Sequence, residues 1–238
     1  MIRSYKLCML LFIVLFSSGC TQTNDTNVLP EPSAIVKNIT QVAESLESFS
    51  VEVIDVINEN ETYVYRIWVQ GEQSRFEGTL PQFGKVTQVS DGDEGRLYLE
   101  DRNIVFIHEP GKAYTIQSEG TPSGISGDSA TDWTFAKVEY PLILDLNGFD
   151  VEVKGTEEIE QQQTIILSLT NQATGIEEIT WWVNIETWIP VRQQIEQVNY
   201  SRLVTYKNVK INEPLDSSLF ELNLPADIYV TEDIQELF

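Results

Sequence analysis

The sequence predicts a mainly β, α+β fold, in which one large antiparallel sheet of roughly eleven strands follows an N-terminal helix and is interrupted by short covering helices. Three observations predict it. Residues 34–47 carry apolar side chains at helical spacing, and residues 62–95 form β-prone runs joined by short turns. Residues 118–130 are rich in glycine and serine, and further β-prone runs follow them. A chain of 238 residues fits one domain of this class.

The N-terminus has the pattern of an export signal. Arg3 and Lys6 precede an apolar run at 7–16, which is too short to span a bilayer comfortably. The small residues directly before Cys20 resemble the lipobox of bacterial and archaeal lipoproteins, in which the signal is cut before the cysteine and its sulfur carries a lipid. Ser17 stands where leucine is usual. An ordinary secretory signal or an uncleaved anchor is the alternative.

Cysteine and charge counts agree with this interpretation. The chain has two cysteines, and cleavage before Cys20 would remove Cys8, which leaves no disulfide partner. We therefore expect a lipoprotein signal peptide at 1–19, a lipidated cysteine and polar tether at 20–32, and a folded domain at 33–238. The formal charge is −22. Such a charge repels nucleic acid and anionic headgroups, so nucleic acid is excluded as a partner.

The first half of the domain is expected to be a helix followed by a meander. Ser33 is the expected N-cap of the helix at 34–47, and Asp91-Gly92 is a strong turn signal. Short turns imply antiparallel neighbours, because a parallel pair needs a long crossover. Strands are expected at 51–58, 62–70, 73–80, 84–90, 96–100, 103–108 and 113–117.

A change of amino-acid composition separates the two halves of the domain. The glycine-rich stretch at 118–130 predicts a flexible loop, and the apolar segment at 131–146 predicts one or two short helices broken at Pro141. We interpret that segment as a lid over the sheet. A structural helix behind an ordinary loop is the alternative. The lid side chains are Trp133, Phe135, Tyr140, Leu142 and Leu144.

The second half is expected to return to strands. A short edge segment at 219–222 and a last helix at 233–238 complete the expected order. The strands are expected at 150–155, 163–170, 176–184, 189–196 and 201–211.

The order of these elements resembles the lipoprotein carrier and receptor (LolA/LolB-like) family. The motifs that carry the resemblance run from residue 34 to about 232: AESLESFSVEV at 43–53, VSDG at 89–92 with LYL at 97–99, WWVN at 181–184, IPVR at 189–192, YKNV at 206–209, and FEL at 220–222 with Pro225. The resemblance implies a twisted, incomplete antiparallel barrel whose mouth is closed by helices, and non-covalent binding of acyl chains. It also implies a basic residue facing the cavity, to which either Arg66 or Arg75 corresponds. An anchored chain looks more like a receptor than like a soluble shuttle.

Strand parity then assigns residues to an inner, groove-forming face, because alternate side chains of a strand share one face. A plain core beneath the helices is the alternative for each of them. The expected groove residues are Ile104, Phe106, Ile165, Leu167, Leu169, Ile179, Trp181 and Val183.

Catalysis and metal binding have little support in the sequence. His108 is the only histidine, no G-x-S-x-G motif is present, and we expect His108 to be a surface residue at a strand end. The acidic run at 91–94 lacks the spacing of a calcium-binding loop. No cofactor and no metal are therefore expected. N-x-[ST] sequons begin at Asn38, Asn60 and Asn199.

Two functions remain open at this point. The first is a membrane-anchored, extracytoplasmic lipoprotein that binds the acyl chains of a lipid or lipoprotein without catalysis. The second is a sensor or scaffold that uses the same half-barrel to bind a protein partner and carries no lipid.

Overall fold

The computed structural model describes residues 29–81, 83–109, 113–116, 131–134, 146, 148–171 and 176–237. The expected signal peptide, Cys20 and the glycine-rich stretch lie outside the described residues. So do Phe135, Tyr140, Leu142 and Leu144 of the expected lid.

Helix α1 spans Pro32–Glu44, and its inward face carries Ile35 and Ile39. The expected cap at Ser33 is wrong, because the helix already begins at Pro32, with Glu31 at the N-cap and no side-chain capping bond. Proline suits this first position, where its fixed φ is helical and its missing N–H is not needed. The helix also ends earlier than expected, since the chain turns at Ser45 and enters the first strand three residues later.

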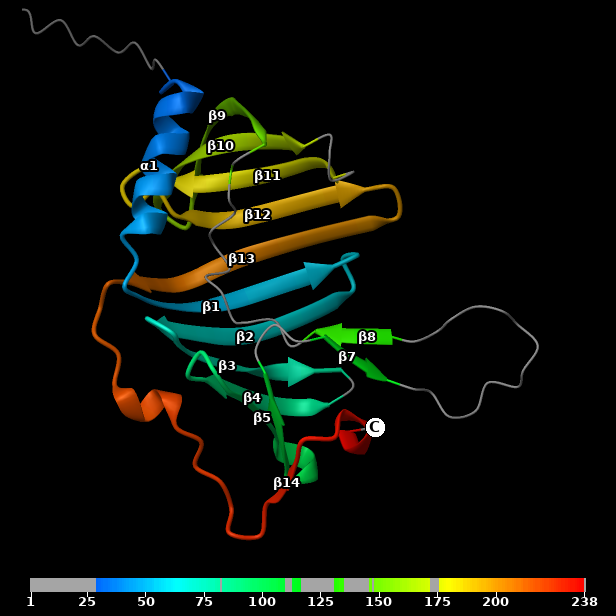
Figure 1. The fold of residues 1–238 in the computed structure, drawn as a ribbon. Helices are drawn as coiled ribbons and strands as arrows, with labels where there is room; N and C mark the ends of the chain where they lie inside the picture. The colour runs from blue at the N-terminus through cyan, green and yellow to red at the C-terminus, as the bar shows by residue number, and fades with distance from the viewer. Residues whose placement is uncertain are drawn as a thin grey trace, which may run out of the picture.

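Two antiparallel meanders make up the sheet (Figure 1). They join through strand β1, which pairs with β2 on one side and with β13 on the other. The order across the sheet is β14-β6-β5-β4-β3-β2-β1-β13-β12-β11-β10-β9, and the sheet is open at its two ends. The first meander is β1 (Ser48–Ile57), β2 (Glu61–Gln70), β3 (Gln73–Leu80), β4 (Gly84–Ser90), β5 (Gly95–Leu99) and β6 (Ile104–His108), with a 3-10 helix η1 (Glu100–Arg102) before β6. The second is β9 (Asp150–Ile159), β10 (Gln162–Asn171), β11 (Ile176–Asn184), β12 (Pro190–Gln197) and β13 (Tyr200–Ile211).

The C-terminal segment returns from the middle of the sheet to its far edge (Figure 1). The expected edge strand at 219–222 is wrong, since its first two residues belong to a 3-10 helix, η2 (Ser217–Phe220), and the expected last helix is η3 (Ile234–Leu237). Between them, strand β14 (Tyr229–Thr231) adds to β6 in parallel, which the sequence did not predict. Its three residues are too few to show a period-two pattern.

Strands β7 (Ala113–Ile116) and β8 (Thr131–Thr134) form a separate two-stranded sheet. The helix expected from residue 131 is therefore wrong for its first four residues, which include Trp133. The pairing of β7 with β8 supplies the backbone partners that favour extended structure, and that pairing is not visible in local sequence. With these strands the described residues contain fourteen strands, not roughly eleven.

One face of the 12-stranded sheet, here called the inner face, carries three buried apolar clusters. The first lies under α1 on β10 and β11, the second on β1, β2 and β13, and the third on β4 to β6. The last is closed by Ile234 and Leu237 of η3. A mainly β, α+β architecture with a twisted antiparallel sheet and an N-terminal helix is thus confirmed.

Candidate functional site

Six of the eight expected groove residues lie together on the inner face. Their side chains share one cluster with Ile35 and Ile39 of α1, and each of the six is at most 2% exposed. Pairing of β10 with β11 explains why these side chains cluster, since Leu167 of β10 lies opposite Trp181 of β11. The six residues are Ile165, Leu167, Leu169, Ile179, Trp181 and Val183.

The other two expected groove residues lie elsewhere. Phe106 is fully buried in the cluster on β4 to β6, and Ile104 packs against that cluster while remaining half-buried. Seven strands separate β6 from β11 in the sheet order. The structure therefore places the eight residues in two separate clusters of one face.

The middle of the inner face is less completely covered. Phe76 of β3, Ile57 of β1 and Ile195 of β12 point to the inner face and stay half-buried. Helix α1 covers the β9–β11 end of the sheet and leaves the opposite ends of β1, β2, β12 and β13 beyond its reach (Figure 1). Apolar side chains that remain accessible on such a face are suited to contact an apolar ligand.

A charged pair also lies on the inner face, and sequence reasoning missed it. Asp55 shares the parity of the buried Val51 and Val53, and Arg202 shares that of the buried Val204. Arg202 donates from Nε and Nη2 to the two carboxylate oxygens of Asp55, at 2.9 and 2.7 Å. The available signal in the sequence was a charged residue at a strand position that alternation assigns to the apolar face. The two strands that meet here are far apart in sequence, so the pairing itself was not predictable.

The charged pair perturbs the groups around it. The hydrogen bond to Asp55 raises the pKa of Arg202 above its ordinary value, although burial opposes that shift. Burial, followed by the charge of Asp55, raises the pKa of Tyr65 to about 12. Burial likewise raises the pKa of Tyr206, whose hydroxyl donates to Oε1 of Gln193 at 3.3 Å. These tyrosines therefore stay neutral at physiological pH and act as hydrogen-bonding groups.

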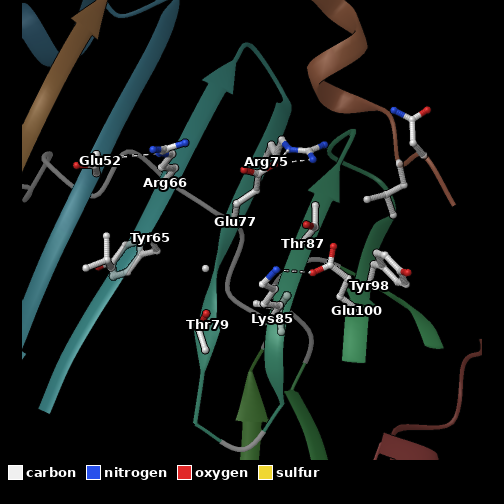
Figure 2. Close-up of a pocket in the computed structure, with 15 residues that line it drawn as sticks. Glu52, Tyr65, Arg66, Arg75, Glu77, Thr79, Lys85, Thr87, Tyr98 and Glu100 are labelled. Atoms are coloured by element: carbon white, nitrogen blue, oxygen red, sulfur yellow. Dashed lines mark hydrogen bonds and ion pairs between the residues drawn. The ribbon is translucent and has the colours of Figure 1, made fainter. Parts of the chain in front are cut away.

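The opposite, outer face carries a polar groove of about 490 Å³ (Figure 2). Three ion pairs line it: Arg66–Glu52 between β2 and β1 at 3.2 Å, Arg75–Glu77 within β3 at 2.6 Å, and Lys85 of β4 with Glu100 of η1 at 3.5 Å. Further lining residues include Thr79, Thr87, Tyr98, Leu222 and Asn223. Because each of these cations has a carboxylate partner, the groove is locally close to neutral on a strongly acidic chain.

Comparison with known proteins gives matches among solved structures. No protein-family model and no curated protein matches the chain. An uncharacterized conserved protein from Thermus thermophilus is similar over 84% of this chain and 97% of its own, at 12% identity and a TM-score of 0.51. The Mycobacterium tuberculosis lipoprotein LppX covers 78% of this chain and 99% of its own, at 16% identity and a TM-score of 0.46. A LolA superfamily protein from Nitrosomonas europaea covers 81% and 98%, at 12% identity and a TM-score of 0.34.

The chain shares the fold of the Thermus thermophilus protein. The architecture that the motif resemblance implied, a twisted and open antiparallel sheet after an N-terminal helix, is confirmed by the described elements. Neither Arg66 nor Arg75 faces inward in this sheet, so the expected correspondence of one of them to a cavity-facing basic residue is wrong. Both lie on the outer face, and Nη1 of Arg75 holds the C-terminal segment through the carbonyl oxygens of Leu219 and Glu221. Arg202, by contrast, lies on the inner face, at the parity of the buried Val204.

His108 is buried in the sheet, with 3% of its surface exposed, so the expectation of a surface residue is wrong. It faces Gly95 across β5 and β6, and its ring stacks on Phe106 at 5.9 Å. A Cβ atom at residue 95 would lie 2.2 Å from Cε1 of the histidine, so glycine is needed there.

In the part of the chain that the structure describes, no helix is long and apolar enough to cross a membrane.

Burial lowers the pKa of His108 below its ordinary 6.5. The imidazole of His108 therefore binds a proton more readily in the unfolded chain than in the folded one. The contribution of neutral His108 to stability is complete above about pH 6.5 and is lost as the pH falls below that value. We expect His108→Gln to flatten the loss of stability between pH 7 and pH 5, by less than about 1.4 kcal/mol per pH unit. Denaturant midpoints at several pH values measure this. Equal slopes in parent and variant would contradict it.

Proposed function

We propose that this protein is a membrane-anchored, extracytoplasmic lipoprotein that binds acyl chains of lipids or lipoproteins on the inner face of its sheet, without catalysis. The signal pattern before Cys20 supports the anchor, with a lipid on the cysteine sulfur holding the domain at the periplasmic or outer surface of the cell membrane. The resemblance of the sequence motifs to the LolA/LolB-like family supports the binding of acyl chains.

One observation carries the proposal. Three apolar clusters follow one another along the inner face, and mid-sheet side chains such as Phe76 and Ile195 remain half-buried beyond α1. Burial of an acyl chain gains about 0.8 kcal/mol for each methylene, so a dozen methylenes supply roughly 10 kcal/mol before ordering is subtracted. That is sufficient for micromolar binding. The residues under α1 form one wall of the proposed groove, and residues 131–146 remain its proposed lid.

A second candidate function rests on the outer groove. Its ion pairs and hydroxyls suit a polar protein segment better than an acyl chain, since their hydrogen-bonding groups have to stay satisfied. A sensor or scaffold that binds a protein partner and no lipid would use this face.

Adjacent residues on β12 offer a matched test of the inner face. Ile195 points inward and Gln194 points outward, and both are half-buried. Ile195→Ser should weaken binding of a fluorescent acyl probe by about 2 kcal/mol, roughly 30-fold, because it removes about three carbons of apolar contact. Gln194→Ser should leave binding unchanged.

The measurement is a fluorescence titration of the full chain carrying Cys20→Ser, with thermal melting as a check of folding. Equal loss in both variants, or no binding in the parent, would reject the inner face as the acyl site. Binding of a protein partner that Lys85→Glu abolishes, in a parent that binds no probe, would favour the second function.

A further inference from the structure

The ion pair on the inner face lies toward the β1–β2 and β12–β13 turns, at the opposite ends of the strands from α1 (Figure 1). The carboxylate of the pair is buried, since the Asp55 side chain is only 7% exposed. The Arg202 side chain is 35% exposed. Tyr65 lies near the guanidinium, whose charge lowers the pKa of the tyrosine against the larger effect of burial. A buried carboxylate therefore fixes an arginine that remains in contact with the space above the inner face.

The nearest neighbours of this pair on the inner face are aliphatic or aromatic. In the register of the sheet, Arg202 lies between Ile57 and Ile195, and Asp55 lies between Val204 and Tyr63. A charged pair in such a setting rarely adds stability over apolar side chains of similar volume, because loss of hydration offsets the attraction between the charges. Its position therefore points to recognition of a polar group that accompanies an apolar ligand.

The chemistry of the pair restricts that group. As a unit the pair is neutral, and it sits in a chain whose formal charge is −22. Guanidinium N–H groups donate to ester and carbonyl oxygens, and the carboxylate of Asp55 accepts from hydroxyl groups. A free carboxylate ligand, by contrast, would have to compete with Asp55 for Arg202 and to approach an acidic protein.

We propose that Asp55 and Arg202 bind the uncharged head of an acyl lipid through its ester and hydroxyl groups and disfavour a free carboxylate head. This inference rests on the proposed binding of acyl chains, and it adds the class of headgroup that the site selects. Asp55 sets this preference, because its carboxylate neutralises the Arg202 guanidinium to which an anionic headgroup would otherwise bind.

Two fluorescent probes with the same acyl chain, a monoacylglycerol and a fatty acid, test the proposal at pH 8.5 in the full chain carrying Cys20→Ser. The parent should bind the monoacylglycerol at least tenfold more tightly. Asp55→Asn should raise affinity for the fatty acid at least tenfold, because Arg202 loses its counter-ion. Arg202→Gln should weaken binding of the monoacylglycerol at least fivefold.

The outer face supplies matched controls in the pair Glu52–Arg66, whose carboxylate lies on the same strand as Asp55. Glu52→Gln changes the net charge as Asp55→Asn does, and Arg66→Gln changes it as Arg202→Gln does. Neither control should alter the affinity for the monoacylglycerol or for the fatty acid. If Asp55→Asn fails to fold, the double variant Asp55→Asn/Arg202→Gln carries the test, since it keeps the site neutral. It should lose at least fivefold of the monoacylglycerol affinity while its thermal melt stays cooperative.

Three outcomes would overturn the inference. Equal affinity of the parent for the two probes would remove the proposed preference. Equal effects in the Glu52 and Arg66 variants would assign the preference to overall charge. Unchanged monoacylglycerol affinity in Arg202→Gln would show that the pair does not contact the head. These results leave acyl binding intact, whereas failure of the parent to bind either probe rejects the proposed function and the inference with it.

Discussion

Cys20→Ser is expected to move the protein from the membrane fraction to the soluble exported fraction, or to leave it unprocessed. A single acyl chain gives only marginal membrane binding, so stable anchoring needs two chains or a second signal. This chain offers no polybasic segment beside Cys20, and its formal charge is −22. A diacyl or dialkyl lipid on the cysteine should therefore be the whole anchor.

Cell fractionation with mass measurement checks this expectation, and Cys8→Ser is the matched control. Cys8 lies within the apolar run of the signal, so its substitution should leave both processing and retention unchanged. Retention of the Cys20→Ser protein in the membrane fraction at the processed size would reject the lipoprotein anchor.

Leu167→Glu is expected to unfold the domain. Leu167 is 0% exposed and lies in the cluster under α1. Truncation of a buried leucine to alanine already costs about 2–5 kcal/mol, and an unpaired carboxylate in an apolar cluster adds several more. The sum is comparable to the whole stability of a typical domain, about 5–15 kcal/mol. Far-UV circular dichroism during thermal melting measures the effect.

The control for this substitution has to lie on the outer face. Ser168 is on that face, as strand parity predicts, but it is 4% exposed and its Oγ donates to Glu178 at 2.6 Å. Ser168→Glu would bring two carboxylates together, so it is not neutral. Thr205→Glu places the charge across from Arg192 on the neighbouring strand and should change stability by less than about 0.5 kcal/mol. A cooperative, parent-like melt of Leu167→Glu would contradict the assignment of Leu167 to the core.

Local sequence predicted most of the elements, because periodicity and turn chemistry act over a few residues. Alternation of Ile165, Leu167 and Leu169 marked the inward face of β10 correctly, and Asp91-Gly92 marked the turn between β4 and β5. The same local rules failed where pairing decides. The residues of β7, β8 and β14 are too few to show a period, and their extended structure depends on partner strands.

The sequence by itself determined the acidic, mainly β character of the chain, the export pattern before Cys20 and the inward parity of its strands. Only the tertiary structure decided which inward residues meet. It placed Phe106 and Leu167 in separate clusters, buried His108 behind Gly95, and paired Asp55 with Arg202 across 147 residues. The physical reason is that side-chain parity is set within each strand, whereas the neighbours of a strand are set by pairing across the whole chain.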